Sequence, residues 1–144
     1  MNEQKLFEAI RQVGITSGDF SLLGRMCGGQ CQVYQVLCGK GNEKLAIRVP
    51  SRMDEQGMID ALKVEMDNLQ VLATKGFQWA PKCYGCSLTF DNPIRLPFLV
   101  LEWKDGSVLH WTSSSPQGDE RRRVLSQLAS IHFTLVSCTF EVGQ

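Results

Sequence analysis

The sequence is poor in several features that define large classes of protein. It holds only two histidines, and its 15 basic residues are balanced by 15 acidic ones, so the formal net charge is zero. A chain without a basic excess lacks the electrostatic footprint of a nucleic-acid binder, and we expect no nucleic-acid partner. The one basic run, at residues 121–123, follows Asp119 and Glu120 and is typical of a solvated helix face.

The sequence has no long apolar run, and its first residues do not predict a leader segment. No run approaches the roughly 20 apolar residues that a membrane-spanning helix needs. The first residues, MNEQKLFEAIRQVG, include acids and no apolar centre, unlike a secretory signal. We therefore expect a cytoplasmic protein, with a nuclear location as the alternative, and no membrane partner.

The six cysteines allow two interpretations. Without a leader, disulfides are not expected, so the thiols are predicted to be reduced and partly buried. Two pairs, Cys27 with Cys31 and Cys83 with Cys86, have spacings that zinc ligands use. The gap between the pairs is far longer than the roughly 12–20 residues of compact zinc modules. A cysteine zinc module therefore stays open only if the fold brings the two pairs together.

Apolar periodicity predicts an alternation of helices and strands. A helix over residues 2–13 should end at Gly14, and a helix over residues 59–74 should end at Gly76. The expected strands are 19–26, 31–39, 43–50, one within 80–92, and 96–103, with a turn at 40–42 and a last helix at 124–136. This order predicts an α+β fold, a twisted antiparallel sheet of about five strands with a helix packed on it.

The strand EKLAIRVP and the helix that follows it place two opposite charges near each other. Strand alternation puts Leu45, Ile47 and Val49 on one face, and Ala46 and Arg48 on the other.

In the following helix, Glu65 falls within the apolar stripe that contains Leu69 and Leu72. A carboxylate on a core-facing stripe needs a partner, because burying it alone is costly. Arg48 is the predicted partner.

The glycine pair Gly28 and Gly29 stands between two predicted strands. Glycines let the backbone approach a ligand closely and expose N–H groups to phosphate oxygens. Arg48, two strands along, would reach the same phosphates, and Glu65 would orient it. The residues thus suggest a site for a phosphorylated ligand.

Taken together, five segments resemble a known family. They are GGQCQVYQV, LAIRVP, VEMDNLQVLATKG with APKCYG, LPFLVLEWKDGSVL, and LSQLASIHFTLVSCTF. In this order they resemble the N-terminal lobe of the protein-kinase-like fold, and most of all the aminoglycoside phosphotransferase family, particularly its fungal members. The resemblance implies a kinase-like lobe over residues 1–104 and a linker with the first helix of an incomplete C-terminal lobe over 105–144.

The resemblance also implies a set of ATP-binding residues. Gly28 and Gly29 would cover the phosphates, and Val33 and Ala46 would pack on adenine. Arg48 stands where a lysine usually contacts the α- and β-phosphates, with Glu65 as its partner. The hinge residues Glu102 and Trp103 would hydrogen-bond adenine through their backbone. The implied partners are the nucleotide and, in a full-length form, a small-molecule phosphate acceptor.

No catalytic residue and no metal ligand can be assigned in the sequence. Phosphoryl transfer needs an aspartate base and residues that hold magnesium. Neither His110 nor His132 begins an H-x-D loop followed by Asn. We therefore expect a fragment of a transferase that is inactive alone, with magnesium bound only if a second lobe is present. The alternative is a non-catalytic binding or interaction module on the same scaffold.

Overall fold

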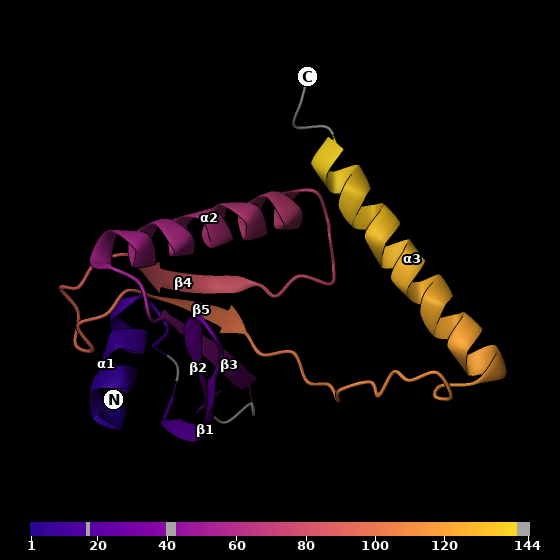
Figure 1. Cartoon of the computed structure of the whole chain (residues 1–144). Helices are drawn as coiled ribbons and strands as arrows, with labels where there is room; N and C mark the ends of the chain where they lie inside the picture. The colour runs from indigo at the N-terminus through magenta and orange to yellow at the C-terminus, as the bar shows by residue number, and fades with distance from the viewer. Residues whose placement is uncertain (17, 40–42, 141–144) are drawn as a thin grey trace. The chain divides into compact units, whose positions relative to one another are not determined.

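The computed structural model describes residues 1–16, 18–39 and 43–140. Within them the chain is α+β, as predicted, with a five-stranded sheet and three helices (Figure 1). In chain order the elements are α1 (Glu3–Gln12), β1 (Phe20–Cys27), β2 (Cys31–Cys38), β3 (Glu43–Pro50), α2 (Glu55–Thr74), β4 (Cys83–Ser87), β5 (Phe98–Glu102) and α3 (Gly118–Phe140). Each predicted element is present. The predicted turn at 40–42 lies outside the described residues.

Local capping explains where the first two helices begin and end. The side chain of Asn2 accepts a hydrogen bond from the Lys5 N–H, and that of Asp54 accepts one from the Gly57 N–H at 2.8 Å. Gly14 and Gly76 have φ angles of 97° and 74°, which favour glycine. Both glycines predicted to end a helix are therefore confirmed.

The sheet is antiparallel throughout, with the strand order β1-β2-β3-β5-β4. Its central strand, β3, carries Arg48. The pairing shifts in β1 between Leu22 and Gly24 and in β4 between Cys83 and Gly85, which indicates a bulge at each place. The bulge in β4 changes which side chains share a face.

The two faces of the sheet carry separate apolar clusters. The larger cluster packs α1 against the face that holds the predicted core residues Leu45, Ile47 and Val49. The smaller cluster packs α2 against the other face, through Leu62, Leu99 and Leu101. Figure 1 shows α1 and α2 on opposite sides of the sheet. Helix α2 therefore lies on the face of Arg48, and Leu62 is its one buried residue.

The chain divides into two compact units. The first, Met1–Gln70 with Pro81–Trp103, contains the sheet, α1 and most of α2; the second, Val71–Ala80 with Lys104–Gln144, contains α3. The functional division into residues 1–104 and 105–144 stays a prediction. Among the described residues no helix has both the length and the apolar character to cross a membrane.

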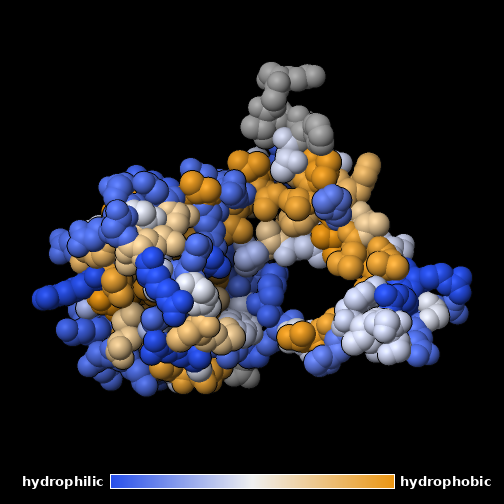
Figure 2. Space-filling model, viewed as in Figure 1, coloured by the Kyte–Doolittle hydropathy of each residue, from blue (hydrophilic) through white to orange (hydrophobic). Residues whose placement is uncertain are grey.

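The helix α3 leaves apolar side chains exposed within its own unit. Leu125, Leu128 and Phe133 expose 50%, 53% and 75% of their surface. Figure 2 shows hydrophobic surface along this helix. At positions 124, 128, 131 and 135, which recur at helical spacing, Leu128 is exposed and the other three residues are half-buried.

Candidate functional site

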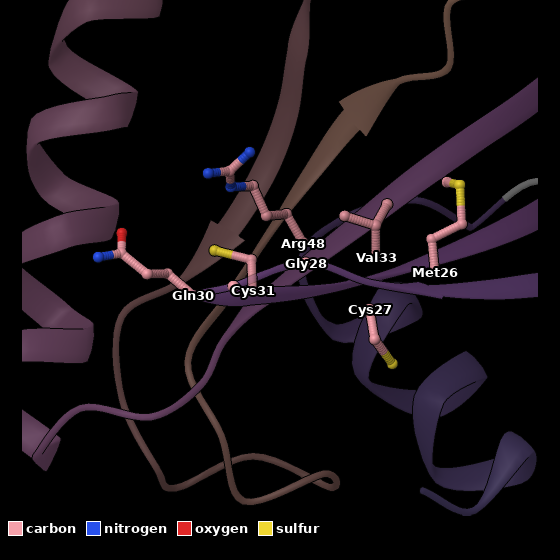
Figure 3. Close-up of a pocket in the computed structure, with 8 residues that line it drawn as sticks. Met26, Cys27, Gly28, Gln30, Cys31, Val33 and Arg48 are labelled. Carbon is pink, nitrogen blue, oxygen red and sulfur yellow. The ribbon is translucent and has the colours of Figure 1, made fainter.

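A cavity of about 400 Å³ lies at the β1–β2 hairpin, on the face of the sheet that α2 covers. It is lined by Met26, Cys27, Gly28, Gly29, Gln30, Cys31, Val33 and Arg48. In Figure 3 the side chains of Met26, Cys31, Val33 and Arg48 project from one side of the sheet, and that of Cys27 projects from the other. Four of the predicted ligand-binding residues, Gly28, Gly29, Val33 and Arg48, therefore meet in one place.

Strand pairing places three of these side chains in a row. Met26 pairs with Val33 across β1 and β2, and Val33 pairs with Arg48 across β2 and β3. Directly paired residues project from the same face of a sheet. The row joins an apolar wall, made by Met26 and Val33, to a cation at its end.

Arg48 forms the predicted ion pair with Glu65. The Arg48 Nε lies 2.9 Å from the Glu65 Oε2, and the two side chains are 40% and 26% exposed. The Nε atom itself is buried and has no hydrogen-bond partner, so its N–H is not aligned with the carboxylate oxygen. The contact is an ion pair with one poorly directed donor. The rest of the guanidinium remains available to the cavity.

The environment of Glu65 shifts its protonation equilibrium. Burial raises the pKa of the Glu65 carboxyl above its ordinary value, and the positive charge of Arg48 only partly offsets this effect. The carboxylate is therefore held in a place that disfavours its charge, and Arg48 is the charge that compensates it.

The glycine pair supplies space and one backbone donor. The Gly28 N–H donates to the Cys31 carbonyl at 2.8 Å and closes the hairpin. In the described part of the chain the Gly29 N–H has no partner. A Cβ on Gly29 would meet no atom within 4 Å, and neither glycine has a positive φ. Glycine is thus not required here by backbone conformation, and its effect is to leave the cavity mouth open.

Ala46 and the two hinge residues lie away from this cavity. Ala46 packs against the cluster of Leu62, Leu99 and Leu101. The Glu102 N–H donates to the Lys82 carbonyl at 2.8 Å, and the Trp103 N–H donates to the Lys44 carbonyl at 3.1 Å.

These contacts bear directly on the predicted hinge. The N–H groups of both residues are used to hold β5 between its neighbours. A base could accept a hydrogen bond from either N–H only after one of these contacts is exchanged.

Four cavity residues were not among the predicted ligand-binding residues. They lie on or beside the glycine hairpin and are Met26, Cys27, Gln30 and Cys31. Cys31 could have been predicted from strand alternation, because it is two residues from Val33 and so projects from the same face of β2. Met26 could be placed only through its pairing with Val33, which depends on the bulge in β1.

The two cysteine pairs lie at different edges of the sheet. Cys31 is in β2 and Cys86 is in β4, with β3 and β5 between those strands. Three strand spacings correspond to roughly 14 Å, and a zinc ion binds each thiolate at about 2.3 Å. One ion therefore cannot bind both pairs. All six cysteines are free thiols, and the described residues contain no group of three or more His, Cys, Asp or Glu side chains suited to a metal ion.

No protein-family model matches the chain, and a search of curated proteins finds no match. The assignment of a function therefore depends on the residues and geometry of the site.

Proposed function

We propose that this chain is the nucleotide-binding lobe of a small-molecule kinase similar to the aminoglycoside phosphotransferases, with ATP as its ligand. The observation that carries the proposal is the Arg48–Glu65 ion pair at 2.9 Å, beside the glycine hairpin and its cavity. A cation on the central strand, held by a helix carboxylate next to a small-residue hairpin, is the arrangement with which kinase-like lobes hold phosphates.

In this proposal each cavity residue has a chemical role. The Gly29 N–H and the Arg48 guanidinium donate to phosphate oxygens, and Met26 and Val33 provide an apolar surface for the nucleoside. Glu65 fixes the guanidinium by charge. Since Arg48 presents a planar fork where a lysine is usual, it suits two oxygens of one phosphate or of neighbouring phosphates.

The expected binding residues Ala46, Glu102 and Trp103 have a weaker place in the proposal. Ala46 packs against the apolar cluster below α2 and does not line the cavity. The hydrogen bonds made by the Glu102 and Trp103 N–H groups must be exchanged if these groups are to bind adenine. The proposal assigns no residue of the described site to the small-molecule phosphate acceptor or to magnesium.

The test is calorimetric titration of the chain with Mg·ATP. Arg48→Ala should weaken binding by about tenfold or more, since a hydrogen bond to a charged group contributes about 1.5–3 kcal/mol. The matched control is Arg122→Ala, which removes an arginine paired with Asp119 at 2.7 Å on the exposed surface of α3. Arg122→Ala should bind Mg·ATP as tightly as the unchanged chain does.

The second candidate is a non-catalytic interaction module that keeps the kinase-like scaffold. It is favoured by the engaged N–H groups of Glu102 and Trp103, which leave the hinge without its usual backbone donors in the observed conformation. If Mg·ATP gives no binding heat, or if both arginine variants bind equally well, the nucleotide proposal fails and this candidate replaces it.

A further inference from the structure

The bulge in β4 brings the two thiols of the CYGC segment to one face of the sheet. In a regular strand, residues three apart project to opposite faces. Here Cys83 lies opposite Leu101, Gly85 opposite Val100, and Cys86 opposite Leu99, so Tyr84 is the extra residue. Both cysteines therefore share the face of Leu99 and Leu101, which is the face that α2 covers.

Contacts around the segment agree with this placement. The Cys86 thiol lies 3.5 Å from the Met66 thioether on α2. The Cys83 thiol donates a hydrogen bond to the Gly85 carbonyl at 3.7 Å, within the same strand. Tyr84 interacts instead with Glu43 and Glu102. The Cys86 and Met66 sulfur atoms are thus in contact under the helix, and Cys83 projects from the same face of β4 as Cys86.

A disulfide fits this pair of cysteines poorly. With one residue bulged out, their Cα atoms are two strand steps apart, about 6.4–6.8 Å, at the upper end of the range that disulfides span. Side chains that project in parallel from one face keep their Cβ atoms about as far apart, whereas disulfides need roughly 3.5–4.5 Å between Cβ atoms, so a direct bond would strain the strand. An ion between the sulfurs requires no such approach.

We propose that Cys83, Cys86 and Met66 form a binding site for one cuprous ion. Thiolate and thioether sulfur are soft ligands that select Cu(I) among the common metal ions. Structural zinc takes four ligands, and the third ligand here is a neutral thioether. Binding replaces the two thiol protons, which pass to solvent, and involves no change of oxidation state. The site extends from exposed Cys83 to half-buried Cys86 and Met66, so the ion has a route from solvent.

This site is separate from the proposed nucleotide site but adjoins it. Met66 follows Glu65 on α2, so an ion bound to Met66 would tie α2 to β4 beside the Arg48–Glu65 pair. The ion would therefore add a second anchor between α2 and the sheet, since Leu62 is the one buried residue of this helix.

The test is an anaerobic titration of the full chain with Cu(I) in competition with the chromophoric chelator bathocuproine disulfonate. One equivalent should bind, and X-ray absorption should show sulfur ligands only. Cys83→Ser and Cys86→Ser should each weaken binding by at least about tenfold, and Met66→Leu should weaken it and remove one sulfur ligand. The matched controls, Cys27→Ser and Cys31→Ser, alter the other closely spaced pair and should bind as the unchanged chain does.

Three results would overturn the proposal. In the first, both Cys83→Ser and Cys86→Ser still bind one equivalent of Cu(I) tightly. In the second, Cys27→Ser loses as much Cu(I) affinity as they do. In the third, X-ray absorption finds the same number of sulfur ligands in Met66→Leu as in the unchanged chain. Circular dichroism shows whether each variant is folded. If Cys86→Ser unfolds, Cys86→Ala keeps the half-buried position apolar and answers the same question.

Discussion

The Nε atom of Arg48 and the Oε2 atom of Glu65 lie 2.9 Å apart, between the central strand and α2. Both side chains are partly exposed, at 40% and 26%. Ion pairs in such places contribute little to stability, because solvent screens them and ordering the side chains costs entropy. The pair is therefore better understood as a means of placing a cation at the cavity than as a support for the fold.

The raised pKa of Glu65 predicts how stability depends on pH. Its ordinary value is 4.5, and the folded value is higher because burial disfavours the carboxylate. Between these two values the folded state binds more protons than the unfolded state, so the stability contributed by this group falls as pH rises. Urea unfolding across this pH range should show a fall that Glu65→Gln removes.

The control for that experiment is Glu120→Gln, since Glu120 is exposed in the first turn of α3. The free energy of unfolding of Glu120→Gln should depend on pH in the same way as that of the unchanged chain. In addition, NMR titration should find a still higher Glu65 pKa in Arg48→Ala, because the Arg48 charge lowers it. A lower value in that variant would contradict the ion pair.

Leu62→Ala should be the most damaging truncation in α2. Leu62 is 1% exposed and joins the helix to Leu99 and Leu101. Losing a buried leucine side chain costs about 2–5 kcal/mol. Val64→Ala, on the same helix at a residue that is 61% exposed, should change stability by less than about 0.5 kcal/mol. Urea unfolding of both variants measures the difference, and equal losses would mean that α2 packs differently.

Two glycine substitutions should differ in their cost. Gly29→Ala adds a methyl group where no atom lies within 4 Å, so stability should change by less than about 0.5 kcal/mol. Gly85→Ala places a Cβ 3.1 Å from Val13, where α1 meets β4, and overpacking of this kind costs about 1–3 kcal/mol. Thermal unfolding of the pair provides the measurement, and a larger loss for Gly29→Ala would refute the hairpin geometry.

The chain should not transfer phosphate by itself. Its carboxylates after Glu102 are Asp105, Asp119, Glu120 and Glu141, of which Glu141 lies outside the described residues, and none has a neighbouring Asn. Without a base and bound magnesium, the positioning and charge neutralisation that make up this catalysis are missing.

A coupled assay of ATP hydrolysis and of transfer to aminoglycosides and small hydroxylated acceptors should therefore give no turnover above background. Turnover that disappears in Arg48→Ala would show that the chain contains a catalytic carboxylate of its own.

The sequence by itself determined the features that repeat along one segment. Alternation in β3 separated Leu45 and Ile47 from Arg48, and the helical stripe turned Glu65 inward, so their contact could be predicted. Both patterns depend on the geometry of a single strand or helix, which is local and regular.

Only the tertiary structure decided which segments meet and where regular pairing is interrupted. The bulge at Tyr84, which turns Cys83 and Cys86 to the same face, exists through the pairing of β4 with β5. The engagement of the Trp103 N–H by Lys44 likewise depends on β5 lying beside β3. The register between strands distant in the sequence is set by packing and by hydrogen bonds across the sheet. Neither can be predicted from the apolar periodicity of a single segment.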